Sequence, residues 1–367
     1  MNLLNCNENN LVKCFNNEDD FINHLKEVRN NSEWKSFQSD NVSFVVKDCT
    51  LYVIPSENAT PVPVRECGIT SIENRCDLYG SALDRLMIMF PNLVGEALTR
   101  AIQSKKNQIL KGYLQYGEYS AIHSDTYTPI DMVEIFKRVI SHIKSLNILK
   151  DDNCVEIAEW SFERTSVLFK FDNSRLIKSY EDALERQDIE VSNIKPRVRV
   201  NVSDIATSGI NLNYSIITTI KGIRYNIPLS SGDNGIYHKG SLKKKYDALQ
   251  DKLDNMFSLF DEAINDLNRL MQVIIYEPVN CMIGLFKSLK LPVKYSSEVV
   301  ERFTAVNGNK PCTAYEIYAG MSEYLDVVET LSNDDLSEFK KIQIEEILAK
   351  AIKKDFTKFD VSGTVAW

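Results

Sequence analysis

The chain has few of the residues that build metal centres and none of the cysteine spacings that hold zinc. It contains four histidines and eight cysteines in 367 residues. No two cysteines stand in a C-x-x-C arrangement, and the histidines do not lie at ligand spacing from them. We therefore expect no metal and no cofactor. The cysteines are expected to be free, partly buried thiols in a reducing compartment.

Long apolar runs are also missing. No stretch approaches the roughly 20 apolar residues that a membrane helix needs. The first residues, MNLLNCNENN, have neither the basic start nor the apolar stretch of a signal peptide. The apolar fraction of 44% and the charged fraction of 26% are ordinary for a globular protein. We expect an intracellular protein that does not enter the membrane.

One segment carries a charge opposite to that of the whole chain. The net charge is −8, yet residues 193–245 hold nine basic and two acidic side chains, so this segment is +7 and the remainder is −15. A local positive field of this kind suggests an exposed basic trough that binds an anion, with nucleic acid as the leading candidate. The nine are Lys195, Arg197, Arg199, Lys221, Arg224, Lys239, Lys243, Lys244 and Lys245.

The same segment has the pattern of paired strands. The run RVRVNV (197–202) alternates strictly, which places its arginines and Asn201 on one sheet face and its valines on the other. Lys221-Gly222 between β-branched runs predicts a hairpin. The alternative, a solvated sheet face whose cations pair with acids from elsewhere, stays open. The candidate nucleic-acid-binding residues are Arg197, Arg199, Lys221, Arg224, Tyr225, Tyr237, Lys239, Lys243, Lys244 and Lys245, with the tyrosines stacking on bases.

Periodicity elsewhere predicts an α+β fold. We expect a mainly antiparallel sheet over 109–228, flanked by long helices, and a helical C-terminal part. The expected flanking helices span 81–106, 132–146 and 242–276. The expected divisions are a mixed N-terminal region (1–65), an α+β core with the basic hairpin (66–240) and a helical part packed on that core (241–367).

The first of these helical regions reads as a packed pair of helices joined at Pro91. Its apolar residues recur at a period near 3.6, so we expect them to be buried. They are Leu83, Leu86, Met87, Phe90, Leu93, Val94, Ala97, Leu98 and Ile102.

Two polar segments are candidate sites. In HSDTYTPID (123–131), a nucleophilic Ser124 activated by His123 is disfavoured, because adjacent strand residues point to opposite faces. A structured turn with Asp131 as helix cap is the favoured interpretation. The glycine-rich stretch 232–241 could present backbone N–H groups to an anion or could simply leave a hairpin, and the two are evenly matched.

Several segments resemble, in the same order, a family of phage- and plasmid-borne proteins defined by a domain of unknown function. The resemblance rests on S-D-x-Y-x-P-I-D before a helix, on H-x-G before the long helix expected over 242–276, and on the stretches 200–209, 313–326 and 348–360. It implies a mobile-element context in bacteria, and hence the bacterial host cytoplasm, and no particular reaction. The positions matching its motifs are Ser124, Asp125, Tyr127, Asp131, His238 and Gly240.

Three hypotheses of function follow. The first is a nucleic-acid-binding protein of a phage or plasmid, such as a single-strand binding or annealing factor. The second is a non-enzymatic protein that binds and blocks a host protein or defence component. A carboxylate-dependent hydrolase using Asp125 is the least favoured, because no spacing of acids and histidines here demands a metal. A homo-oligomer is compatible with the first two.

Overall fold

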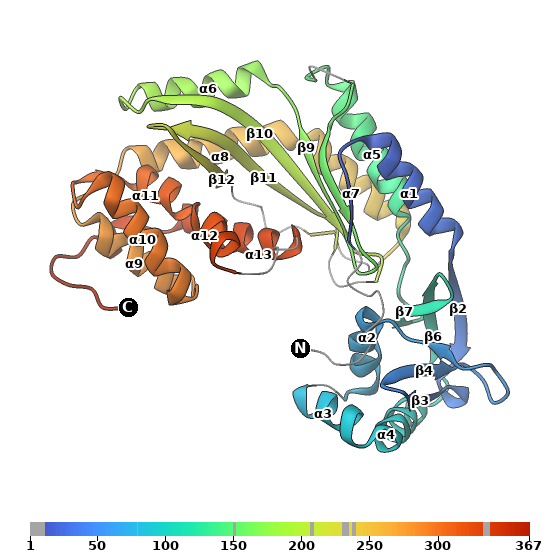
Figure 1. Ribbon diagram of the computed structural model, residues 1–367. Helices are drawn as coiled ribbons and strands as arrows, with labels where there is room; N and C mark the ends of the chain where they lie inside the picture. Colours follow the sequence, from blue (N-terminus) through green and yellow to red (C-terminus); the bar gives the residue numbers. More distant parts are fainter. Residues whose placement is uncertain are drawn as a thin grey trace.

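A curved antiparallel sheet dominates the computed structural model, which describes residues 12–78, 80–149, 152–205, 209–229, 235–236, 240–332 and 338–367 (Figure 1). The sheet has six strands in the order β1-β8-β9-β10-β11-β12. This confirms the predicted α+β class with a large antiparallel sheet. The strands are β1 (Lys13–Phe15), β8 (Val155–Trp160), β9 (Thr165–Lys170), β10 (Val191–Val202), β11 (Asn211–Ile220) and β12 (Ile223–Pro228).

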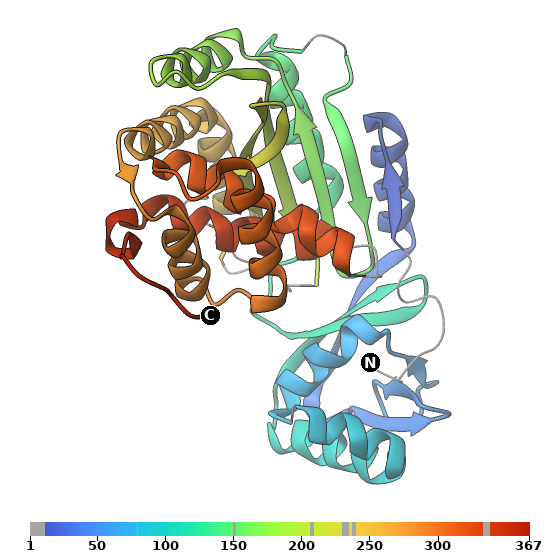
Figure 2. The same ribbon diagram turned by 60° about the vertical axis from the view of Figure 1, so that its left-hand side comes forward.

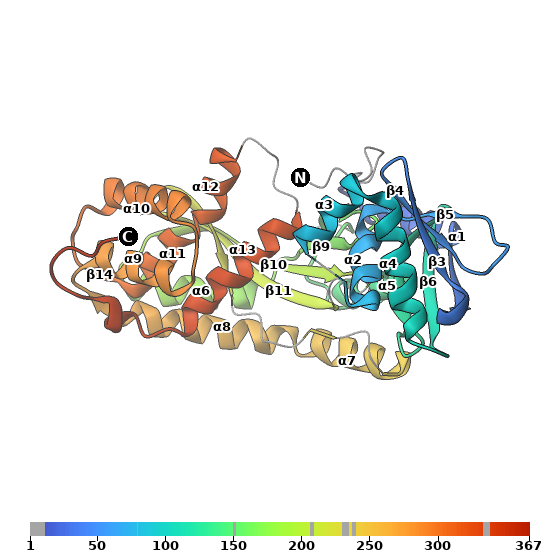
Figure 3. The ribbon, with the colours of Figure 1, turned by 90° about the horizontal axis from the view of Figure 1, so that it is seen from below.

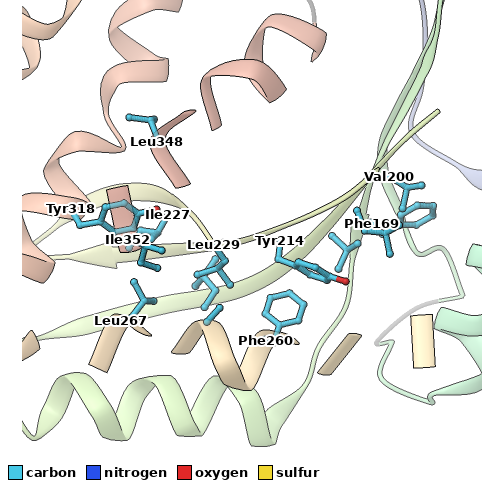
Figure 4. Close-up of a cluster of buried hydrophobic side chains, with 14 of the residues drawn as sticks. Phe169, Val200, Tyr214, Ile227, Leu229, Phe260, Leu267, Tyr318, Leu348 and Ile352 are labelled. Carbon is cyan, nitrogen blue, oxygen red and sulfur yellow. The ribbon is translucent and has the colours of Figure 1, made fainter. Parts of the chain in front are cut away.

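Helices cover the apolar face of this sheet. The ring of Tyr214 on β11 meets that of Phe260 with 5.0 Å between centroids, and these side chains belong to a continuous core with Phe169 and Val200 (Figure 4). Asp131 and Ser241 cap two of the helices through their side chains, the first as predicted. The helices are α1 (Glu18–Asn30), α5 (Met132–Ser145), α6 (Ser174–Glu185), α7 (Leu242–Asp254) and α8 (Met256–Met271).

The C-terminal part is helical, as predicted, and its last long helix crosses the opposite face of the sheet (Figure 3). It is α13 (Glu338–Ala349), followed by the short 3-10 helices η2 (Lys350–Lys353) and η3 (Phe356–Phe359). The preceding elements are β13 (Ile274–Ile275), α9 (Pro278–Ser288), α10 (Val293–Asn307), β14 (Cys312–Thr313), α11 (Ala314–Met321) and α12 (Tyr324–Leu331).

A smaller body, here called the N-terminal body, lies below one end of the large sheet (Figure 2). It has a core of its own that runs from Phe37 to Ile122. Its strands are β2 (Ser32–Gln38), β6 (Ile109–Gln115) and β7 (Glu118–Ser124) in one sheet and β3 (Ser43–Lys47), β4 (Thr50–Ile54) and β5 (Val62–Pro63) in another. Its helices are α2 (Glu66–Cys76), α3 (Ser81–Met89) and α4 (Pro91–Ser104), and the 3-10 helix η1 spans Ser39–Asn41.

Several predicted boundaries differ from this arrangement. The expected single sheet over 109–228 is wrong, because β6 and β7 pair with β2 rather than with β8. The expected division at residue 65 does not match the N-terminal body, whose core spans that position. The long helix expected over 242–276 ends its first half at Asp254 and starts again at Met256.

Helix α6 follows β9, and its first turn is capped by the Asn173 side chain. Among the helices in the described part of the chain, none combines the length and apolar character that crossing a bilayer requires.

Candidate functional site

The alternation of β10 separates polar from apolar side chains as predicted. Val198, Val200 and Val202 are fully buried in the main core. Arg197 and Arg199 point to the opposite face, but each is only 6% exposed. The arginines therefore share one face of the sheet without forming an exposed surface.

Both arginines are neutralised by carboxylates from distant parts of the chain. Arg197 forms an ion pair with Glu156 of β8. The Nε atom of Arg199 lies 3.5 Å from Glu345 Oε2 of α13. The predicted exposed basic trough is thus wrong at these two residues, because the acidic remainder of the chain folds back onto them.

Other predicted cations are scattered. Lys221 Nζ contacts Glu316 Oε1 at 2.6 Å. Lys243 and Lys244 are exposed in the first turn of α7, near the N-terminal body, whereas the exposed Arg224 lies on β12 at the other end of the sheet (Figure 1). The cations of this segment that the structure describes consequently do not converge on one surface.

The remaining predicted contacts are similarly dispersed. Lys245 is buried and donates to the Thr128 carbonyl oxygen at 3.0 Å. Tyr225 is half-buried, and burial raises its pKa to about 12. The predictions for Tyr237, His238 and Lys239 lie outside the described residues.

The polar face of the sheet continues across five strands as a row of facing side chains. Register pairs Cys14 with Glu159, Glu159 with Ser166, and Ser166 with Asn201. Asn201 in turn faces Asn211 of β11. Residues paired in this way lie on the same side of a sheet, so these five define one feature, here called the polar row.

Helix α13 covers the neighbouring part of this face with two glutamates. Asn226 Nδ2 donates to Glu345 Oε1 at 2.9 Å, and Asn213 Nδ2 donates to Glu346 Oε1 at 3.2 Å. Between helix and sheet is a cavity of about 10 Å³, lined partly by Arg199, Asn213 and both glutamates. A cavity of this size and polarity can hold about one water molecule. The helix and sheet therefore meet here through polar contacts.

Segments quoted for the family resemblance meet at the junction of the N-terminal body and the large sheet. The Tyr127 hydroxyl donates to the Asp204 carbonyl oxygen at 2.7 Å, and the Thr128 hydroxyl donates to the Gly240 carbonyl oxygen at 2.9 Å. Ser124 hydrogen-bonds the Thr126 hydroxyl at 2.8 Å. These contacts support the structured turn and give Ser124 no basic partner of the kind a nucleophile needs.

The remaining motif residues are structural or exposed. The Asp131 side chain accepts from the backbone N–H groups of Val133 and Glu134 and pairs with Arg29 at 3.1 Å. Asp125 is exposed, and no group of three or more potential metal ligands occurs among the residues that the structure describes. The seven described cysteines are free, as expected.

The Asp204 carboxylate is the notable ionisable group of this junction. It is buried and accepts hydrogen bonds from the Tyr113 hydroxyl at 3.0 Å and from Gln115 Nε2 at 3.5 Å, both from β6. Burial raises its pKa to about 6, against the opposing effect of these hydrogen bonds. The sequence offers no sign of this, since it requires β6 and the end of β10 to meet.

The N-terminal body carries an apolar surface that sequence reasoning missed. At the turn from α3 to α4, five large apolar side chains are between 36% and 66% exposed. We call this surface the apolar corner, and its members are Leu86, Ile88, Met89, Phe90 and Leu93. Leu86, Phe90 and Leu93 were expected to be buried, and this expectation is wrong. Leu83, Met87, Val94 and Leu98 do reach the core as predicted.

The periodic pattern could have revealed this surface. Ile88, Met89 and Phe90 are three consecutive apolar residues, and a helix packed on one side can bury only part of such a run.

Comparison of the chain with known protein families, curated proteins and solved structures finds no match.

Proposed function

We propose that the protein acts by binding another protein through the apolar corner. The observation that carries this proposal is the clustering of five large, exposed apolar side chains over eight residues, 86–93. Isolated exposed apolar residues are ordinary, but contiguous patches of several hundred Å² mark interaction sites. Of the functions considered, this supports a non-enzymatic protein that binds and blocks a host or defence component.

The size of the corner fits the centre of an interface. Side chains of this kind, half exposed, offer on the order of 500 Å² of apolar surface together. A standard interface buries roughly 800 Å² per partner, with an apolar centre and a polar rim. The corner therefore supplies the centre, and neighbouring polar side chains of α3 and α4 supply the rim.

The charges beside the corner indicate the chemistry of the partner. On α4, Arg100 pairs with Glu96 at 2.5 Å, whereas Arg85 of α3, next to Leu86, is exposed and forms none of the ion pairs found among the described residues. An exposed cation beside the apolar side chains suits a partner surface that is apolar at its centre and carries a carboxylate at its rim.

Binding tests need a variant that changes only the corner. Phe90→Asp with Leu93→Asp places charge in the centre of the patch, and Val306→Asp on α10, where Val306 is 58% exposed, is the matched control. A partner captured on the wild-type chain is identified and purified, and its affinity is measured by calorimetry. We expect at least a tenfold loss for the double variant and none for the control.

Two results would count against the proposal. One is equal affinity of the double variant and the wild type for the purified partner. The other is a concentration-dependent dimer of the chain alone that Phe90→Asp abolishes, measured by light scattering, since the corner would then bind a second copy.

Nucleic-acid binding is the second candidate. It is favoured by Lys195, Arg224, Lys243 and Lys244, which are exposed and form none of the ion pairs found among the described residues. Fluorescence anisotropy with single- and double-stranded probes across a salt series tests it, because phosphate contacts strengthen as salt falls. Lys243→Ala with Lys244→Ala should lower the salt slope, and no binding at low salt would remove this candidate.

A further inference from the structure

Two side chains in the polar row are buried without hydrogen bonds. Asn201 is 5% exposed and Ser166 is 4% exposed, and they face each other across β10 and β9. Neither the amide nitrogen and oxygen of Asn201 nor the hydroxyl of Ser166 has a partner within the described part of the chain. Three polar atoms are thus unpaired at one position of the sheet.

Such groups are uncommon in a folded protein, because a buried polar atom without a partner destabilises the native state. The neighbouring Asn213 and Asn226 each donate one hydrogen bond to a glutamate of α13, although Asn226 Oδ1 has no partner among the described residues. Asn201 and Ser166 differ from them because their side chains make no hydrogen bond at all within the described part of the chain.

The polar row also leads outward. From Ser166 it passes to Glu159, which is half-buried, and ends at Cys14 on the edge strand β1, which is exposed. Burial raises the pKa of Glu159, and the nearby cations Lys341 and Arg199 oppose that shift. Glu159, with the two cations beside it, is therefore the ionisable side chain next to Ser166 on this face.

We infer that Asn201 and Ser166 form the base of a binding site for a small, neutral, planar ligand with an adjacent hydrogen-bond donor and acceptor, as on a nucleobase. A carboxamide presents a donor and an acceptor side by side, and the adenine edge formed by N6 and N7 matches that pair. The Ser166 hydroxyl supplies a third bond. Both side chains are uncharged, so a neutral ligand suits them.

Adenine is the probe that tests this inference, with calorimetry and thermal unfolding of the whole chain as readouts. Ligand that binds only the native state raises the unfolding temperature with its concentration. We expect adenine to do so for the wild type. We expect Asn201→Leu to be at least as heat-stable as the wild type without ligand and to show no adenine-dependent rise.

Two further variants keep the test decisive. Ser166→Ala removes one hydroxyl with little change of shape and should weaken adenine binding about tenfold. This variant still tests the inference if Asn201→Leu does not fold. Asn213→Leu on the neighbouring strand breaks a bond to α13 and should lower stability while leaving adenine affinity unchanged. Corner variants should not alter adenine binding either, so this site and the protein-binding proposal fail separately.

The inference is overturned if adenine, guanine, cytosine and uracil at millimolar concentration all leave the unfolding temperature unchanged. It is also overturned if the adenine effect persists in Asn201→Leu. Tighter binding of adenosine monophosphate than of adenine would contradict the neutral class of ligand.

Discussion

Replacing Asp204 with Asn should stabilise this protein at neutral pH. The Asp204 carboxylate is buried at the junction between β6 of the N-terminal body and the large sheet, and its pKa is raised to about 6 from an ordinary value of 3.8. The native state therefore holds a proton more tightly than the unfolded chain. The protonated Asp204 side chain thus contributes to the free energy of unfolding. This contribution is fully present below about pH 4 and is lost as the pH rises through about 6.

The magnitude follows from the size of the shift. Each unit of pKa difference corresponds to about 1.4 kcal/mol, so keeping Asp204 ionised in the folded state costs roughly 3 kcal/mol above pH 7. Asparagine carries no charge and still accepts from the Tyr113 hydroxyl. We expect Asp204→Asn to gain up to about 3 kcal/mol at pH 7.5 and little at pH 4.

Urea unfolding at several pH values measures this difference. Trp34 stacks on Tyr113 with 4.6 Å between ring centroids, so tryptophan fluorescence reports on the junction itself. Asp125→Asn changes an exposed carboxylate in the same region and is the control, with an expected effect within about 0.5 kcal/mol. A loss of stability in Asp204→Asn at pH 7.5, or a gain that does not depend on pH, would refute the reasoning.

Two other predictions test the packing. Arg199→Met alone should lower the free energy of unfolding by roughly 3 kcal/mol, because it leaves the buried Glu345 without its cation. Arg199→Met combined with Glu345→Leu should recover most of that loss. A double-mutant cycle by urea unfolding measures both effects, and equal losses in the single and double variants would contradict the ion pair. Gly112→Ala should cost about 1–3 kcal/mol because its Cβ would lie 2.4 Å from the Tyr119 ring; unchanged thermal unfolding would show that this ring moves aside.

Local patterns in the sequence were informative where a single element decides the outcome. The RVRVNV alternation predicted which face each side chain of β10 takes, and the valines are indeed in the core. Asp131 before a periodic apolar stripe predicted a helix cap, which the structure confirms. Both results depend only on residues that lie close together in the sequence, within one or two helical turns or a few positions of a strand.

The sequence did not predict which distant segments of the chain pair with each other. Glu156 and Glu345 reach Arg197 and Arg199 only after β8 and α13 are placed against β10. A charge count over a segment cannot reveal such partners, and this is why the exposed basic trough was expected. The pairing of β6 with β2 and the burial of Asp204 likewise depend on contacts between segments far apart in the chain.

Periodicity also overstated burial in α3 and α4. An apolar stripe predicts which side of a helix faces inward, but the amount buried depends on how much surface lies beneath it. Met87 and Leu98 rest on the core of the N-terminal body, whereas Phe90 and Leu93 extend past it at the turn between the helices. The excess apolar surface is what the protein-binding proposal uses.

Hydrogen exchange of residues 86–93, measured on the chain alone and in complex with its purified partner, tests this proposal most directly. The account predicts that amide exchange in this stretch slows on binding, while the exposed end of α10 near Val306 exchanges at the same rate in both states. Unchanged exchange over 86–93 in a stable complex would contradict it.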